Sequence, residues 1–257
     1  MSWLSTVTSE SKPKPPLTVI HGDGGVGKST LAANGKSPLF IPFEDGLAGL
    51  QGVARTSRPE SLAQFLSLLD ELEQEEHDFR TVIIDSADWA EPVLEAAVCE
   101  MYGAPRIADI DYGKGYAALA ETWVNVLNRL TRLRDNRGIF PLVICHSAVS
   151  QAPDPLKGEH PQWTLKLQKK SAARLVEWAD IVGYAAVEYA VTKEKGGFGR
   201  ESKRAVGTGE RLLHLQPSPA FVAKNRYGMP ASIPLDWAAF TQAYMHAVNP
   251  QPQEAQQ

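Results

Sequence analysis

A glycine-rich segment near the N-terminus constrains this chain more than any other part of its sequence. An apolar run at residues 17–21 leads into nine residues that contain the pattern Gly-x-x-x-x-Gly-Lys-Ser, namely Gly22, Asp23, Gly24, Gly25, Val26, Gly27, Lys28, Ser29 and Thr30. A strand, such a loop and a helix start together form a phosphate-binding loop, whose backbone N–H groups surround the β-phosphate of a nucleoside triphosphate. In such a loop Lys28 contacts the β- and γ-phosphates, and the Ser29 hydroxyl coordinates Mg²⁺. We therefore predict a site for ATP and Mg²⁺ formed by these nine residues.

The length and composition indicate one ordinary globular domain. The chain has 257 residues, of which 43% are apolar and 22% are charged, as in typical soluble α/β proteins. No apolar run approaches the roughly 18 residues that span a bilayer, so we expect no membrane segment and a cytoplasmic location. We place the core at residues 17–248, between flexible tails at 1–16 and 249–257. Cys99 and Cys145 are isolated in apolar stretches, which favours buried thiols in a reducing compartment.

Apolar periodicity predicts that strands and helices alternate in the first part of the chain. Apolar runs indicate buried strands, and apolar residues three or four positions apart indicate helices with one buried face. The expected strands are residues 17–21, 39–44, 81–85 and 140–146, and the expected helices are a short one from Lys28 and residues 59–77, 89–102 and 116–137. This alternation predicts an α/β fold with a mostly parallel twisted sheet, helices on both faces, and ligands at the carboxyl ends of the strands.

The pattern changes after His146. Residues 147–163 contain proline and glycine and show no period, which predicts a long loop. A helix at residues 167–179 and strands at 181–192 and 211–216 follow, with glycine clusters between the two strands that suggest a hairpin. We therefore expect antiparallel strands at the C-terminal side of the sheet.

Three polar side chains end expected strands and are candidates for chemistry. Asp85 comes 57 residues after Lys28, where P-loop enzymes place the carboxylate that holds Mg²⁺ through water; a helix-capping role is the alternative. Glu44 is a candidate base for the attacking water, although Glu44 and Asp45 also fit the role of solvated loop acids. His146 could sense the γ-phosphate, or it could be a structural histidine.

Two cations near the C-terminus are further candidates. Lys224 and Arg226 are separated by one residue, so their side chains point the same way if the segment is a strand. Cations inserted across a subunit interface stabilise charge on a transferring phosphate. We interpret both as candidate catalytic residues that act on the nucleotide of a neighbouring subunit, with surface solvation as the alternative.

The assembled motifs resemble those of RecA-type ATPases, and most closely those of phage RecA-like single-strand annealing ATPases, over about residues 17–237. Besides the phosphate-binding loop, the matching segments are Phe40-Ile41-Pro42-Phe43-Glu44, Val82-Ile83-Ile84-Asp85-Ser86, Asp111-Tyr112-Gly113-Lys114-Gly115-Tyr116 and Lys224-Asn225-Arg226-Tyr227-Gly228, which is similar to the Lys-Asn-Arg-Phe-Gly motif of bacterial RadA. The resemblance implies a RecA-like P-loop NTPase core, a homo-oligomer, a catalytic Glu44, and trans-acting Lys224 and Arg226. His146 departs from it, because RecA proteins usually carry glutamine at this place.

By the same resemblance, the region after His146 corresponds to the part of RecA-type proteins that touches single-stranded DNA. Residues 157–211 contain 11 Lys and Arg against 7 Asp and Glu, although the whole chain has a net charge of −4. Phosphate contacts and one stacking surface, the combination used by sequence-tolerant strand binders, are offered by Lys157, Trp163, Lys166, Lys169, Lys170 and Arg174. The alternative is an amphipathic helix with a solvated basic face.

Together these observations predict an Mg²⁺-dependent ATPase that binds single-stranded DNA and promotes strand annealing and homologous recombination. A single-strand DNA-binding protein is a further expected partner. Two alternatives remain open from the sequence. If the protein is a small-molecule kinase, a metabolite would raise its ATP turnover and DNA would have no effect on it. A nucleotide-gated module would recruit a single-strand binding or replication protein and hydrolyse ATP slowly.

Overall fold

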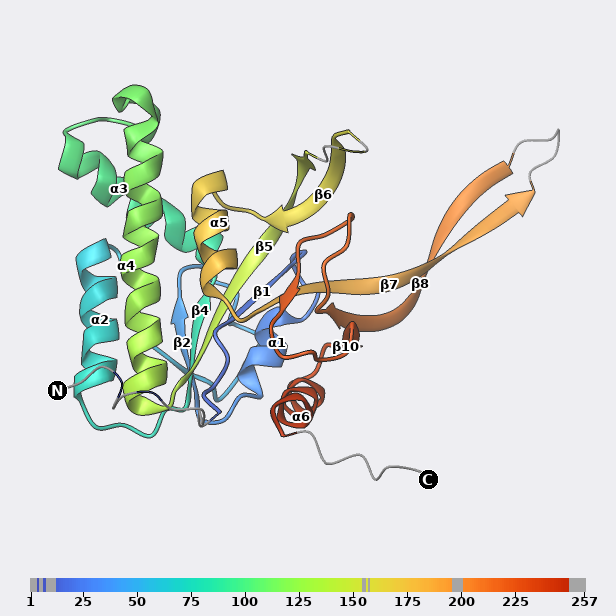
Figure 1. The fold of residues 1–257 in the computed structure, drawn as a ribbon, viewed down its shortest axis with the longest axis horizontal. Helices are drawn as coiled ribbons and strands as arrows, with labels where there is room; N and C mark the ends of the chain where they lie inside the picture. The colour runs from blue at the N-terminus through green and yellow to red at the C-terminus, as the bar shows by residue number, and fades with distance from the viewer. Residues whose placement is uncertain are drawn as a thin grey trace.

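The computed structural model describes residues 4, 7, 13–153, 156, 158–195 and 201–249, and the side chains of residues 189–195 and 201–208 are outside this description. Strands and helices alternate in the first part of the chain and antiparallel strands follow (Figure 1). The strands are β1 (Thr18–Gly22), β2 (Pro38–Pro42), β3 (Ala54–Arg55), β4 (Thr81–Asp85), β5 (Phe140–Ala152), β6 (His160–Leu165), β7 (Ile181–Lys195), β8 (Glu201–His214), β9 (Lys224–Asn225) and β10 (Ser232–Pro234). The helices are α1 (Lys28–Ala33), α2 (Leu62–Gln74), α3 (Ala87–Tyr102), α4 (Lys114–Arg137), α5 (Lys169–Trp178) and α6 (Trp237–Val248), with short 3₁₀ turns η2 (Ile107–Asp109) and η3 (Asp111–Gly113).

Within the described residues, ten strands form one sheet, whose main path runs β10-β8-β7-β1-β5-β4-β2-β3. The strands from β7 to β3 along this path are mutually parallel. Strand β8 runs antiparallel to β7 and β10, while β6 and β9 add antiparallel to β5 and β7. The expected α/β fold, with a mostly parallel sheet and antiparallel strands at its C-terminal side, is therefore confirmed, and it agrees with the RecA-like core expected from the sequence.

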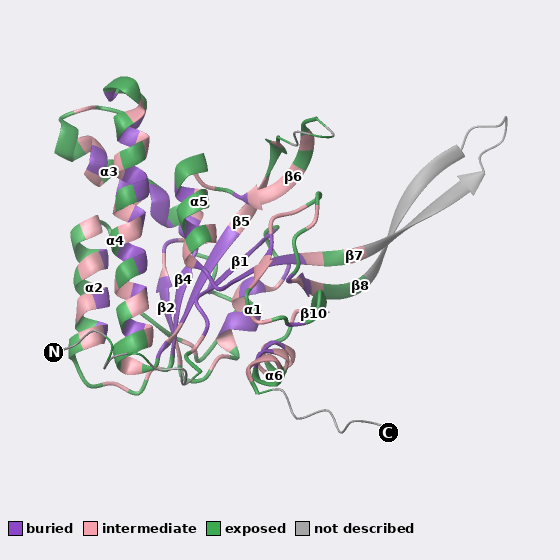
Figure 2. Ribbon diagram, viewed as in Figure 1, coloured by how far each residue is buried: buried purple, intermediate pink, exposed green. Residues whose placement is uncertain are grey.

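Helices cover both faces of this sheet. Successive residues of a strand point to opposite sides, so neighbouring residues of a buried strand pack against different helices. Val19 in β1 belongs to the cluster that contains the apolar residues of α2, α3, α4 and α5. The next residue, Ile20, belongs to the second cluster, with α1 and α6. Figure 2 shows the central strands buried between these layers. Among the described residues, no helix combines the length and the apolar character of a membrane span.

Helix α4 illustrates how the sequence directs this packing. Its largest buried residues recur at intervals of three or four, at Leu119, Trp123, Val126, Leu130 and Leu133. Gly138 ends the helix with a left-handed φ of 65°, a conformation that glycine adopts without strain. Near this end Arg132 donates from Nε to Glu73 of α2 at 2.7 Å. This pair therefore joins α4 to α2 on the outer surface.

The expected long loop at residues 147–163 is wrong in part. Strand β5 continues past His146 to Ala152, and β6 pairs with it antiparallel, with Ser147 opposite Leu165 at the base of the hairpin. The hairpin extends beyond the main body of the sheet (Figure 1), and most of its residues are partly or fully exposed. Backbone hydrogen bonds build such a ribbon without a buried apolar face, so hydrophobic periodicity does not detect it.

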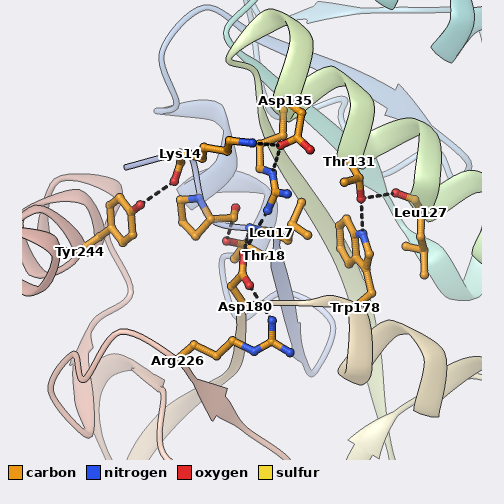
Figure 3. Close-up of polar contacts among 12 residues, drawn as sticks. Lys14, Leu17, Thr18, Leu127, Thr131, Asp135, Trp178, Asp180, Arg226 and Tyr244 are labelled. Atoms are coloured by element: carbon orange, nitrogen blue, oxygen red, sulfur yellow. Dashed lines mark hydrogen bonds and ion pairs between the residues drawn. The ribbon is translucent and has the colours of Figure 1, made fainter. Parts of the chain in front are cut away.

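Asp180 joins distant parts of the chain just before β7 (Figure 3). The residue is 7% exposed. Its Oδ2 accepts hydrogen bonds from the backbone N–H of Leu17 at 3.0 Å and from Arg134 at 3.4 Å, and its Oδ1 accepts one from Arg226 at 3.0 Å. The carboxylate therefore ties the start of β1, helix α4 and the segment after β9 to the same point.

Lys14, in the expected N-terminal tail, also contacts the core in this view (Figure 3). Its Nζ lies 3.0 Å from Oδ1 of Asp135 on α4. Its carbonyl oxygen accepts a hydrogen bond from the Tyr244 hydroxyl of α6 at 2.6 Å. The segment that leads into β1 thus bridges α4 and α6.

We expect the substitution Asp180→Asn to lower the free energy of unfolding by about 3 kcal/mol, since removing one partner of a buried charge network costs roughly 3–5 kcal/mol. The asparagine side chain would place its own N–H group against N–H donors whose hydrogen bonds a carboxylate oxygen of Asp180 now accepts. Urea denaturation measures the change as a lower midpoint at unchanged slope. The control is Asp109→Asn, which removes an exposed partner of Arg106 and should leave the midpoint unchanged. Equal midpoints for both variants would contradict this role of Asp180.

Candidate nucleotide-binding site

The loop between β1 and α1 has the backbone shape that its glycines allow. A Cβ atom on Gly22 would lie 2.3 Å from the carbonyl oxygen of Ala185 in β7, so this close contact excludes a side chain. Gly25 and Gly27 have φ values of 76° and 113°, which favour glycine. The Lys28 side chain folds back under the loop and donates from Nζ to the carbonyl oxygens of Gly22 and of the next residue, both at 2.8 Å. Burial lowers the pKa of Lys28, and nearby acidic groups oppose that shift.

Ser29 and Asp85 meet at the ends of α1 and β4. The Ser29 hydroxyl donates to Oδ2 of Asp85 at 2.8 Å, across 56 positions of sequence. Asp85 is 3% exposed, and burial raises its pKa while the hydrogen bond from Ser29 acts in the opposite direction. A hydroxyl and a buried carboxylate side by side are hard oxygen ligands of the kind that Mg²⁺ takes. The residues present therefore fit an Mg²⁺ site, and the ion bound there would neutralise charge on the β- and γ-phosphates.

Glu44 lies two residues beyond the end of β2. The backbone N–H of Phe43 donates to the carbonyl oxygen of Asp85 at 2.7 Å, which extends the pairing of β2 with β4 beyond Pro42. The Phe43 ring is fully buried and meets Phe65 edge to face, with the ring centroids 4.9 Å apart. This anchor places Glu44, which is half-buried, beside the predicted Mg²⁺ residues.

Five of the nine predicted loop residues line a cavity of about 350 Å³, a size typical of small-molecule sites. Its lining consists of Gly25, Gly27, Lys28, Ser29, Thr30, Glu44, Gly46, Gly49, Leu50, Asp85, His146 and Arg211. The other loop residues have supporting positions. Gly22 and Asp23 supply the carbonyl oxygens that bind Lys28, Val26 is buried in the core, and Gly24 faces His146. The fold thus brings the loop together with Glu44, Asp85 and His146, as the sequence predicts.

Arg211 is a cavity residue that sequence reasoning missed. It belongs to β8, and a Cβ atom on Gly27 would lie 3.2 Å from its Nη1 atom. In the sheet β7 lies beside β1, and β8 lies on the other side of β7. This strand order brings β8 close to the loop that follows β1. A lone arginine in a strand carries no sequence signal for such a position, so only the strand order reveals it.

His146 points toward the phosphate-binding loop and is held from behind by Asp88, a second residue that sequence reasoning missed. The Nε2 atom of His146 lies 3.8 Å from where a Cβ atom on Gly24 would stand. On the other side of the ring, Nδ1 is 2.9 Å from Oδ2 of Asp88, and the backbone N–H of His146 donates to Oδ1 of Asp88, also at 2.9 Å. The hydrogen bond with Asp88 raises the pKa of His146, and burial opposes it. Burial would raise the pKa of Asp88, but the hydrogen bonds from His146 hold it below its ordinary value.

Three of the cations predicted to bind DNA lie within residues 166–170, here called the basic segment, which begins beside His146. Lys166 follows β6, while Lys169 and Lys170 open α5, and all three are exposed. Farther along α5, Arg174 pairs with Glu121 at 3.1 Å and with its helix neighbour Glu177 at 3.3 Å. Lys157 lies outside the described residues.

Trp163 lies in β6, within a group of aromatic rings. Its ring stacks on Tyr184 of β7, with centroids 6.4 Å apart and planes inclined by 20°. Tyr184 in turn stacks on Phe221. Trp163 is half-buried, so one part of its side chain packs against the protein and the rest is exposed to solvent.

Lys224 and Arg226 lie near the amino end of β7, away from the phosphate-binding loop. Strand β9 pairs with the start of β7, with Asn225 opposite Ile181, whereas the phosphate-binding loop adjoins Ala185. Four residues of strand separate these positions, roughly 13 Å. The Nζ atom of Lys224 donates to two carbonyl oxygens at the end of α5, at 2.7 and 3.0 Å, and Arg226 binds Asp180. Both cations are therefore remote from the cavity of their own chain.

The fold and the loop together define a nucleotide-binding protein of the P-loop NTPase class. More particularly, the chain belongs to the AAA domain family designated AAA_24, whose family model matches residues 14–227.

Two further comparisons describe similar proteins. The chain is 30% identical over 174 residues to the SPbeta prophage-derived uncharacterized protein YorG of Bacillus subtilis (strain 168). The match covers 65% of this chain and 50% of YorG, so the chain spans about half the length of this curated relative. Among solved structures, the RadB recombinase has a TM-score of 0.43 and 15% sequence identity, covering 82% of this chain and 91% of that chain.

Proposed function

We propose that this protein is an Mg²⁺-dependent ATPase that binds single-stranded DNA beside its nucleotide site and promotes the annealing of complementary strands. One contact carries the proposal. The backbone N–H of Lys166, the first cation of the basic segment, donates to the carbonyl oxygen of His146 at 2.9 Å, and His146 lines the nucleotide cavity. A change at His146 on ATP binding or hydrolysis would therefore be transmitted directly to the basic segment.

In the proposed hydrolysis, Lys28 and the N–H groups of the loop hold the β- and γ-phosphates. Glu44 accepts a proton from the attacking water while the water oxygen bonds to the γ-phosphorus. The bond from this phosphorus to the bridging oxygen breaks, and ADP leaves with the electron pair. His146 donates from Nε2 to an oxygen of the transferring group, which stabilises the charge that develops there.

The basic segment supports binding to a polyanion. Lys166 has a side chain that is 60% exposed, and its Nζ lies 3.9 Å from the Asp88 carboxylate, a separation that makes only a weak ion pair. Lys169 and Lys170 are exposed in the first turn of α5. These cations are therefore available for the phosphates of a nucleic acid strand, and such binding weakens with salt as counterions are released.

A charge-reversal variant tests the DNA site. We expect replacement of Lys166, Lys169 and Lys170 together by glutamate to lower the affinity for a fluorescent oligo(dT) strand by at least about tenfold at moderate salt. The dependence of the affinity on salt should also become less steep, because fewer phosphates are neutralised. Fluorescence anisotropy measures both quantities, and ADP affinity serves as the control for folding.

A control variant distinguishes local contacts from total charge. Replacing three exposed cations elsewhere, Lys36, Arg106 and Lys114, by glutamate changes the net charge equally and should weaken binding far less. Equal losses in both variants would reject the basic segment as the site. ATP turnover that rises with a metabolite and ignores oligo(dT) would favour the kinase alternative.

For Lys224 and Arg226 we propose the trans-acting role that the sequence resemblance implies. Their distance from the cavity of their own chain is consistent with action on a neighbouring subunit's nucleotide. Arg226 keeps a side chain that is 55% exposed despite its contact with Asp180. In an oligomer the guanidinium would exchange this carboxylate for the phosphate of the adjacent subunit.

A further inference from the structure

Asp88 stands between the nucleotide cavity and the basic segment. Its side chain is 4% exposed and contacts His146 at 2.9 Å and Lys166 at 3.9 Å. Neither the phosphate-binding loop nor the proposed proton transfer uses this carboxylate. A buried acid shared by a cavity residue and a surface cation therefore needs its own explanation.

The position of Asp88 is set by the helix that carries it. Asp88 lies in the first turn of α3, where a carboxylate is favoured by the unpaired N–H groups of the helix start. Its two oxygens hold His146 by the backbone N–H and by the ring Nδ1 together, so rotation of the ring would break a partly buried hydrogen bond. With Nδ1 turned to the carboxylate, Nε2 is the ring atom that faces Gly24 and the cavity.

We infer that Asp88 is a positioning residue: it aims Nε2 of His146 at the γ-phosphate, and through Lys166 it couples that histidine to the strand bound on the basic segment. This inference rests on the proposed function. When Lys166 moves to a phosphate of the strand, Asp88 loses its second cation and binds the His146 imidazolium more strongly. DNA would thereby favour the charged histidine, the form that best stabilises the transferring phosphate.

The charges around His146 come from several elements. Asp88 on α3 and Glu44 after β2 favour the imidazolium, and Lys28 on α1 disfavours it. The charges of Asp85, at the end of β4, and of His146 also attract each other without direct contact, and Lys166 approaches through Asp88. Because Asp88 provides the largest contribution and raises the pKa of His146, its removal should lower that pKa. Activity that needs the imidazolium is present below the pKa and declines as pH rises through it.

The substitution Asp88→Asn tests the positioning role. The asparagine oxygen can still accept the backbone N–H of His146, but its amide cannot stabilise the imidazolium. We expect kcat at neutral pH to fall about 10- to 100-fold, as for the loss of supporting carboxylates elsewhere, with little change in KM. The alkaline limb of the kcat profile should move to lower pH. The control is Glu100→Gln, an exposed acid on the same helix, which should change neither quantity.

Direct titration of His146 by NMR provides a readout that does not require turnover. In the wild-type chain, oligo(dT) should raise the pKa of His146, and the Lys166→Ala variant should no longer respond in this way. The Asp88→Asn variant should show a lowered pKa without DNA. An unshifted His146 in Asp88→Asn would overturn the inference even if the protein hydrolyses ATP. A wild-type chain without ATPase activity but with both shifts would reject only the proposed hydrolysis.

Discussion

Replacing Lys28 with alanine should lower ATP turnover by about 10³-fold, equivalent to about 4 kcal/mol of lost transition-state stabilisation. Lys28 is 5% exposed, and its ammonium is bound only 2.8 Å from carbonyl oxygens of the loop. A triphosphate in the cavity would attract this ammonium strongly, because a cation shielded from water has few competing partners. Steady-state release of inorganic phosphate measures turnover, and calorimetry with ADP measures binding, which should also weaken.

The matched control is Lys36→Ala, which removes an exposed lysine just beyond α1 and should leave both measurements unchanged. Circular dichroism and the urea midpoint show whether Lys28→Ala is folded. A folded variant with unaltered turnover would contradict the assignment of the phosphate-binding loop. Since every proposed function of this protein depends on that loop, this experiment has the widest consequences.

Replacing Glu44 with glutamine should lower kcat by about 10²- to 10⁴-fold, the range for loss of a general base, while ADP affinity stays nearly the same. Glutamine has the shape of glutamate but cannot take the proton of the attacking water. The buried ring of Phe43 keeps the backbone of residue 44 in place, so the geometry of the cavity should survive. Single-turnover hydrolysis with and without oligo(dT) separates the chemical step from product release.

The neighbouring acid provides the control for this second prediction. Asp45 is exposed one residue farther along, and Asp45→Asn should retain full turnover. The sequence left open whether both acids are merely solvated, and the two variants decide between the possibilities. Equal effects of Glu44→Gln and Asp45→Asn would support the solvated interpretation and reject Glu44 as the base.

Much of the fold could be predicted from the sequence because the central strands are buried on both faces. Runs such as that ending at Asp85 stand out from the polar segments around them, and the spacing of Leu119 and Trp123 indicates the buried face of α4. The β5–β6 hairpin could not be found in this way, since it is paired by backbone groups and most of its residues are partly or fully exposed. Apolar periodicity detects burial and not pairing.

The residues of the candidate site also fall into two groups, those that a local sequence pattern predicts and those that only the fold brings together. Lys28, Ser29 and Asp85 belong to local patterns, and the structure places them together. Asp88 has the appearance of an ordinary acid at a helix start. Its contact with His146 arises because β5 runs beside β4, which leads into α3.

The sequence by itself determined the nucleotide loop, because its chemistry depends on backbone freedom and residue types within nine consecutive positions. It also determined which strands are buried. Only the tertiary structure decided the contact of His146 with Asp88, the entry of Arg211 into the cavity, and the contact of Arg226 with Asp180. These contacts join residues 46 or more positions apart, so they depend on strand order and register, which follow from the packing of the whole sheet.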